Sequence, residues 1–200
     1  MNPSDLPIQL RGSRLATSLL RVAGWRVRFD GLPSLQGVAV VYPHTSNWDF
    51  LIGMLAKWSV GFPVTFWGKD SLFRLPLFGR WLRWLGGRPV ERGAPNGIVG
   101  QMARELTEAK EKGEFMWLAL APEGTRKYQD SWRSGFYHVA LAAKVPLALV
   151  YFDFAEKVVS VQKFIMLSGD VEEDIRCVAE YLGPRVGKRP ADAAPVRWKA

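Results

Sequence analysis

Residues 38–56 read VAVVYPHTSNWDFLIGMLA, and the change of pattern within this stretch decides the fold. The apolar run 38–42 lies between a glycine and a proline and predicts a buried strand, whereas residues 50–56 predict a helix. His44 therefore lies where a strand ends and a helix begins. In open α/β sheets, ligands bind at the carboxyl ends of the strands, so this position predicts chemistry at His44.

The residues around His44 allow two interpretations. Ser46 and Asp49 have the S-x-x-D spacing of a capping box, so Asp49 could simply complete the N-terminus of the helix. His44 lies five residues before Asp49, and a carboxylate in the first helical turn can reach a ring in the preceding loop. Such a pair makes a general base, because the carboxylate fixes the imidazole tautomer and stabilises the imidazolium. Ser46 could also act as a nucleophile, although capping explains it more simply.

The composition predicts a globular protein that binds an anionic partner. The chain has 200 residues, 48% of them hydrophobic, which is enough to bury the core of one domain. Lys and Arg number 27 against 19 Asp and Glu, a formal charge of +8. This charge suits nucleic acid, anionic lipid or a phosphorylated substrate, and the nine tryptophans are typical of a membrane interface or a base-stacking platform. We find no helix-turn-helix or RNA-binding signature and expect no nucleic-acid partner.

The cysteine and histidine content favours a reducing compartment and no metal site. Cys177 is the one cysteine, so no internal disulfide can form, and we expect a cytoplasmic protein. No apolar stretch approaches the ~18–20 residues that span a bilayer, and we expect no signal peptide. The two histidines, His44 and His138, have no cysteine or carboxylate cluster around them, so we expect no metal. His138 is expected to be structural or exposed.

The remaining patterns predict an α/β fold of one domain, with a mixed, mostly parallel sheet flanked by helices. Apolar or alternating runs predict further strands at residues 25–30, 62–67, 115–120, 147–154 and 158–167. Helical spacing and capping signals predict further helices at residues 15–22, 98–112, 134–144 and 170–182.

Residues 71–85 read SLFRLPLFGRWLRWL and combine aromatic, leucine and arginine side chains. One interpretation is a buried helix whose arginines extend to the surface. The other is an interfacial patch with its arginines on lipid headgroups and with Phe73, Phe78, Trp81 and Trp84 in contact with the membrane. We predict the second.

Three polar clusters follow predicted strands, at residues 44–49, 87–92 and 123–126. Arg92 and Arg126 carry guanidinium groups that can bind phosphate with two hydrogen bonds, and Gly124 permits a close approach of the backbone. Either arginine alone is more typical of a surface salt bridge. Their occurrence together with His44 favours a binding site.

In this order, the clusters resemble the motifs of the glycerolipid acyltransferase family, which includes lysophosphatidic acid and glycerol-3-phosphate acyltransferases. The resemblance covers about residues 37–153. It rests on four blocks, namely H-x-x-x-x-D at 44–49, G-R-P-V-E-R at 87–92, P-E-G-T-R at 122–126 and V-P-L at 145–147. Each block alone is weak evidence for the family, whereas all four in this order are highly specific to it.

The resemblance implies a role for each residue of these blocks. His44 would be the catalytic base that deprotonates the acceptor hydroxyl, and Asp49 would orient its ring. The phosphate of the acceptor would be bound by Arg92, Glu123, Gly124, Thr125 and Arg126. The hydroxyl would attack an acyl thioester directly, without an acyl-enzyme, and the one thiol lies far from these blocks in the sequence.

The implied function is transfer of a fatty acyl group from acyl-CoA or acyl carrier protein to a lysophospholipid such as 1-acylglycerol-3-phosphate, in phospholipid biosynthesis or remodelling. No cofactor beyond the acyl donor is expected. We expect a cytoplasmic, peripheral protein on the inner face of the membrane. The expected partners are the membrane surface, the lysophospholipid and the acyl carrier protein or coenzyme A thioester.

Two alternatives remain open. Where the family usually has Asn, Phe and Ser, this chain has Pro43, Ala121 and Lys127, which allows an acceptor without phosphate, such as a lyso-aminolipid. A non-catalytic lipid-binding protein of the membrane surface is the second alternative. The presence of His44 and Asp49 argues against it.

We divide the chain into three parts. Residues 1–36 form an N-terminal amphipathic helix and strand, residues 37–183 form the acyltransferase domain, and residues 184–200 form a loose basic tail. The tail is rich in Pro, Ala, Lys and Arg, a composition typical of a segment without a packed core.

Overall fold

The predicted α/β fold with one mixed sheet is confirmed. The computed structural model describes residues 7–90 and 97–198. Its strands are β1 (Arg26–Phe29), β2 (Gln36–Tyr42), β3 (Thr65–Lys69), β4 (Gly87–Val90), β5 (Met116–Leu120), β6 (Leu147–Asp153) and β7 (Val158–Ile165). Within the described ranges they form one sheet in the order β1-β7-β6-β2-β5-β3-β4, in which only the pairing of β6 with β7 is antiparallel.

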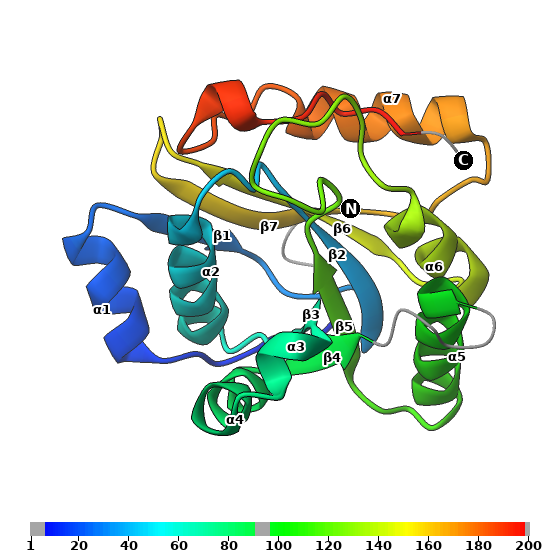
Figure 1. Cartoon of the computed structure of the whole chain (residues 1–200), viewed down its shortest axis with the longest axis horizontal. Helices are drawn as coiled ribbons and strands as arrows, with labels where there is room; N and C mark the ends of the chain where they lie inside the picture. Colours follow the sequence, from blue (N-terminus) through cyan, green and yellow to red (C-terminus); the bar gives the residue numbers. More distant parts are fainter. Residues whose placement is uncertain (1–6, 91–96, 199–200) are drawn as a thin grey trace.

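Helices cover both faces of this sheet (Figure 1). They are α1 (Arg14–Val22), α2 (Asn47–Val60), α3 (Asp70–Phe73), α4 (Pro76–Trp84), α5 (Gly97–Glu111), α6 (Gly135–Ala143) and α7 (Val171–Leu182), with a short 3-10 helix at Pro190–Asp192. Alternate residues of β2 face the two layers: Val38 and Val40 pack with α5, α6 and α7, whereas Ala39 faces the layer of α2. None of the helices in the described part of the chain has the length and apolar character to cross a bilayer.

The strand after α2 begins later than predicted. Gly61 ends α2 in the left-handed conformation, with φ of 73°. The N–H of Phe62 then bonds the carbonyl of Lys57, and Pro63 has no N–H to give to a neighbouring strand. These residues therefore continue the turn, and β3 begins only at Thr65.

The aromatic and arginine-rich segment 71–85 is divided between α3 and α4, because Pro76 lies at the first position of a new helix. Phe73, at the end of α3, is only 3% exposed, so its predicted contact with the membrane is wrong. The turn between the helices points its ring inward. The other predicted contacts lie at the surface, with exposed fractions of 41% for Phe78, 45% for Trp81 and 73% for Trp84.

The described segments nearest the two ends of the chain are more integrated in the fold than predicted. β1 pairs with β7, so the strand assigned to the N-terminal part belongs to the main sheet. A loose tail was predicted over 184–200; for residues 184–198, which the structure describes, this is wrong, since Ala194 and Trp198 are buried. The Trp198 ring stacks on Trp132 at a centroid distance of 6.0 Å. A few apolar residues in a basic segment are thus enough to pack it against the body of the domain.

Candidate active site

The sheet register brings two of the predicted polar clusters together. β2 and β5 are adjacent and parallel, with Val40 opposite Leu120, so the residues that follow them leave the sheet at the same edge. The backbone N–H of His44 donates a hydrogen bond of 2.6 Å to Oε2 of Glu123. The third predicted cluster includes Arg92, which lies outside the described residues, so its predicted contact stays a prediction.

Asp49 serves both as a helix cap and as a partner of His44. Its Oδ2 accepts hydrogen bonds from the N–H groups of Thr45 at 2.7 Å and Ser46 at 2.8 Å. The bond to Ser46 N–H and the Ser46 hydroxyl, which accepts backbone N–H groups of the first turn, form the capping box of α2. The same oxygen lies 3.3 Å from Nδ1 of His44. The cap is therefore confirmed, and the same geometry allows the predicted pairing with His44.

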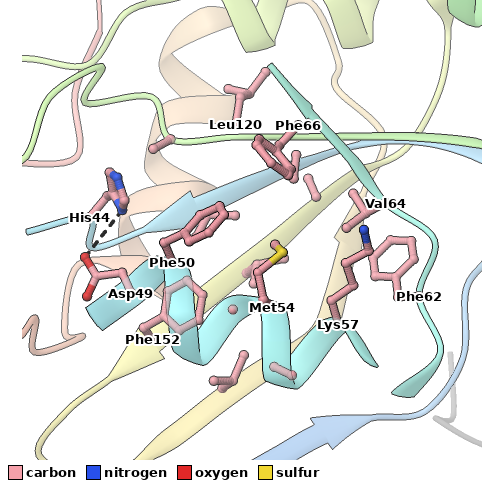
Figure 2. Close-up of a pocket in the computed structure, with 18 of the residues that line it drawn as sticks. His44, Asp49, Phe50, Met54, Lys57, Phe62, Val64, Phe66, Leu120 and Phe152 are labelled. Atoms are coloured by element: carbon pink, nitrogen blue, oxygen red, sulfur yellow. Dashed lines mark ion pairs between the residues drawn. The ribbon is translucent and has the colours of Figure 1, made fainter. Parts of the chain in front are cut away.

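This geometry leaves the other ring nitrogen of His44 free for chemistry. Because Nδ1 faces a carboxylate that is 1% exposed, Nε2 is the nitrogen that can accept a proton from a substrate. The His44 side chain is 22% exposed and lines a cavity (Figure 2). The Ser46 hydroxyl accepts the N–H of Trp48 and donates to Asp49, so it acts as a cap, and its use as a nucleophile is not favoured.

Glu123 is buried and hydrogen-bonded to two backbone N–H groups, an arrangement that does not favour the phosphate contact predicted from the sequence. It is 2% exposed, and its two oxygens accept the N–H groups of His44 and Ala194. Burial raises the pKa of this carboxyl, and the two N–H donors oppose that effect by stabilising the charged form. Burial, together with the charge of Glu123, also raises the pKa of Tyr42 to about 12.

The residues that follow Glu123 in the P-E-G-T-R block lie at or near the surface. Gly124 has φ of +68°, and a Cβ atom there would lie 2.7 Å from Nε of Arg133. The glycine therefore makes room for the Arg133 guanidinium. The sequence analysis did not identify Arg133, and the one available signal was its place as a basic residue soon after the P-E-G-T-R block. Arg126 is exposed and lines the same cavity as His44. Thr125 accepts the N–H of Lys127 at 3.4 Å, and its predicted substrate contact stays a prediction.

The cavity has a volume of about 550 Å³ and lies between α2, the sheet and the α3–α4 pair. Its walls are mostly apolar, and they include Phe50, Met54, Phe66, Leu120 and Phe152 (Figure 2). Polar groups gather at one end, where His44 comes from the loop before α2, and Asn47 and Asp49 come from its first turn. The volume and apolar lining are those of a small-molecule site.

Lys57 lies at the opposite end of the cavity, close to Phe62 and Val64 (Figure 2). Its Nζ donates a hydrogen bond of 2.6 Å to the carbonyl oxygen of Leu85. Burial lowers its pKa. The side chain therefore links α2 to the end of α4 and closes this end of the cavity.

The sequence analysis predicted the helix but missed the cavity beside it. Phe50, Gly53, Met54 and Lys57 recur at helical spacing and form the wall contributed by α2. The available signal was this stripe, which begins directly after Asp49 and contains a glycine. A stripe of this kind is more often core, so only the tertiary structure identifies it as a cavity wall.

Comparison with known proteins agrees with this geometry. A family model described as Acyltransferase matches residues 26–152, and the chain therefore belongs to this acyltransferase family. A 1-acyl-sn-glycerol-3-phosphate acyltransferase from Pseudomonas aeruginosa is 31% identical over 118 residues, which are 56% of this chain and 43% of that relative. The chain thus spans less than half the length of this relative.

A solved structure supports the likeness of the fold. The crystal structure of the 1-acyl-sn-glycerophosphate (LPA) acyltransferase PlsC from Thermotoga maritima superposes with a TM-score of 0.51 at 18% sequence identity. The match covers 86% of this chain and 78% of that protein. The family resemblance predicted from the four sequence blocks is confirmed.

We predict that Asp49 contributes more to stability than His44. Replacing Asp49 with Ala leaves the N–H groups of Thr45 and Ser46 without their acceptor and should lower the free energy of unfolding by about 2–4 kcal/mol. His44→Ala removes a partly exposed ring and should cost less than about 1.5 kcal/mol. Urea unfolding of the two variants measures both values, and equal losses would contradict the double role of Asp49.

Proposed function

We propose that this protein transfers a fatty acyl group from an acyl thioester to the hydroxyl of a lysophospholipid. The observation that carries the proposal is the His44–Asp49 pair at the polar end of a long apolar cavity. A general base beside an apolar cavity is suited to a substrate that joins an acyl chain to a reacting polar group. The donor is acyl-CoA or acyl carrier protein, and the basic surface of the chain suits an acidic carrier.

The chemistry needs no covalent enzyme intermediate. Nε2 of His44 removes the proton of the acceptor hydroxyl as its oxygen bonds to the thioester carbonyl carbon. Asp49 stabilises the imidazolium that forms. The carbon–sulfur bond then breaks, and the imidazolium returns its proton to the leaving thiolate. The acyl chain occupies the cavity throughout, in contact with residues such as Phe50 and Met54.

The acceptor is proposed to carry a phosphate that binds near Arg126. Arg126 lines the same cavity as His44, and the Arg133 guanidinium lies close to Gly124. Neither arginine forms an ion pair with any residue that the structure describes. Two nearby cations without carboxylate partners favour an anion between them. Arg92, outside the described residues, is proposed as a further contact.

The layer of α1, α2 and α4 is proposed to dock on an anionic membrane. These helices lie on one face of the sheet (Figure 1). They expose the large apolar side chains of Leu15, Leu19, Val22, Trp48, Leu51, Phe78, Trp81 and Trp84. They also expose the arginines Arg14, Arg21, Arg80 and Arg83. Apolar groups beside arginines on one face are typical of interfacial binding, and the cavity lies under this layer, where a lipid substrate would arrive.

The reaction is tested by incubating the purified protein with labelled acyl-CoA or acyl carrier protein and a panel of lyso-lipids, with products read by mass. We expect an acylated lysophospholipid, and we expect His44→Ala to lower the rate by about 10²–10⁴-fold while circular dichroism stays unchanged. Near-normal turnover by folded His44→Ala would remove His44 from the mechanism. Lipid binding without turnover by the wild type would favour the non-catalytic alternative.

The phosphate contact is tested with Arg126→Lys. Lysine cannot reproduce the planar pair of donors, so we expect the KM for a lysophosphatidate to rise about tenfold with little change in kcat. Arg176→Lys, at an exposed position on α7, is the matched control and should behave as wild type. Equal kcat/KM values for lysophosphatidate and monoacylglycerol would exclude the phosphate contact and favour an acceptor such as a lyso-aminolipid.

Membrane docking is tested by flotation with vesicles that contain anionic lipid. Replacing both Trp81 and Trp84 with Ala removes exposed aromatic area, so we expect the vesicle-bound fraction to fall about tenfold. Leu141→Ala removes an exposed apolar side chain of α6, on the opposite face of the sheet, and should not change binding. Unchanged flotation of the tryptophan variant would contradict docking through α4.

A further inference from the structure

Residues 184–198, which we call the C-terminal strap, pass across the candidate active site. They lie beyond the region that matches the family model, which ends at residue 152. The strap runs beside the loop between β5 and α6 (Figure 1). Its backbone is hydrogen-bonded to the domain at several points. Phe154 and Trp132 donate their N–H groups to the carbonyls of Val186 (2.8 Å) and Arg197 (2.7 Å), and the N–H groups of Arg189 and Ala194 donate to the side chains of Thr45 (3.1 Å) and Glu123 (2.9 Å).

One of these bonds connects the strap to the backbone of His44. The N–H of Ala194 donates to Oε1 of Glu123, and the other oxygen of this carboxylate accepts the N–H of His44. Ala194 is 0% exposed and Glu123 is 2% exposed, so water cannot replace a lost donor without rearrangement. A buried carboxylate oxygen without a donor is costly, and the place of Glu123 therefore depends on both N–H groups.

A second set of contacts holds the residues on either side of His44. The Oγ1 atom of Thr45 accepts the N–H of Arg189. A Cβ atom on Gly187 would lie 2.8 Å from Thr45 Oγ1 and 3.1 Å from Pro43 Cβ, so the strap packs closely against both neighbours of His44. The loop that carries the candidate base is thus held between β2, the start of α2 and the strap.

The strap is anchored at its two ends by contacts outside the site. The guanidinium carbon of Arg185 lies 4.1 Å from the centroid of the Tyr151 ring, a cation–π contact. At the other end, Trp198 stacks on Trp132 with an interplanar angle of 13°. Contacts of this kind fix the strap independently of any substrate.

We propose that the C-terminal strap positions the candidate base, with the backbone N–H of Ala194 acting through Glu123 on His44. This inference rests on the proposed acyl transfer at His44. No described residue of the strap lines the cavity. Loss of the Ala194 N–H should therefore displace the base while leaving the binding of the acyl chain unchanged.

The test is Ala194→Pro, which removes the N–H, against Ala194→Gly, which keeps it. The preceding Ala193 tolerates a following proline, because it is extended with φ of −74° and ψ of 128°. We expect Ala194→Pro to lower kcat by about tenfold or more, since small displacements of a catalytic group are costly, with KM for the acyl donor unchanged. Ala194→Gly should retain most of the wild-type kcat. Equal kcat values for the two variants would overturn the proposal.

A readout without turnover separates this inference from the proposed function. The chain has two histidines, so the ring signals of His44 and His138 can be distinguished by NMR, with His44→Ala for assignment. We expect Ala194→Pro to shift the His44 signals and leave those of His138 in place, whether or not the protein acylates the chosen acceptor. Unshifted His44 signals would overturn the inference.

If Ala194→Pro fails to fold, Thr45→Val provides the second variant. It keeps the size of the side chain and removes the hydroxyl that accepts the Arg189 N–H. A lower kcat at unchanged KM, together with shifted His44 signals, supports positioning by the strap. A kcat and His44 signals equal to those of the wild type would contradict it.

Discussion

The buried carboxylate of Glu123 is the group on which the arrangement of the candidate site depends. It follows β5, and it accepts the N–H of His44, which follows the adjacent strand β2. Parallel pairing of two strands brings their carboxyl ends to the same edge of the sheet. It does not fix the backbone beyond the last hydrogen bond between the strands. A fully buried carboxyl acceptor does so, because leaving its oxygens without donors is costly. The cost appears as the raised pKa of Glu123.

Asp49 illustrates how one side chain can meet a structural and a chemical requirement together. The start of α2 needs acceptors for its free N–H groups, and a histidine base needs a carboxylate against one ring nitrogen. Oδ2 of Asp49 does both within the span from His44 to Asp49. The interpretation as a cap and the interpretation as a catalytic partner are therefore not alternatives. The rigid helix terminus orients the candidate base.

The layer of α1, α2, α3 and α4 combines two properties that the sequence showed only in part. Its outer surface exposes Trp81 and Trp84, whereas its inner surface encloses the cavity beside His44. Phe73 was predicted on the outer surface because its neighbours are arginine and leucine, but the turn before Pro76 directs it inward. Composition alone could not show which side chains of residues 71–85 face inward and which face outward, because the segment has apolar residues on both sides.

The sequence by itself determined the features that depend on near neighbours in the chain. The strand before His44, the capping box and each of the motif blocks arise from patterns within a few residues. Only the tertiary structure decided the role of Glu123, the enclosure of the cavity and the packing of the C-terminal strap. Each of these depends on partners far apart in the sequence, such as Glu123 and Ala194, separated by 71 residues. Such contacts form only when the sheet brings their elements together, and no local pattern records which buried group will meet which donor.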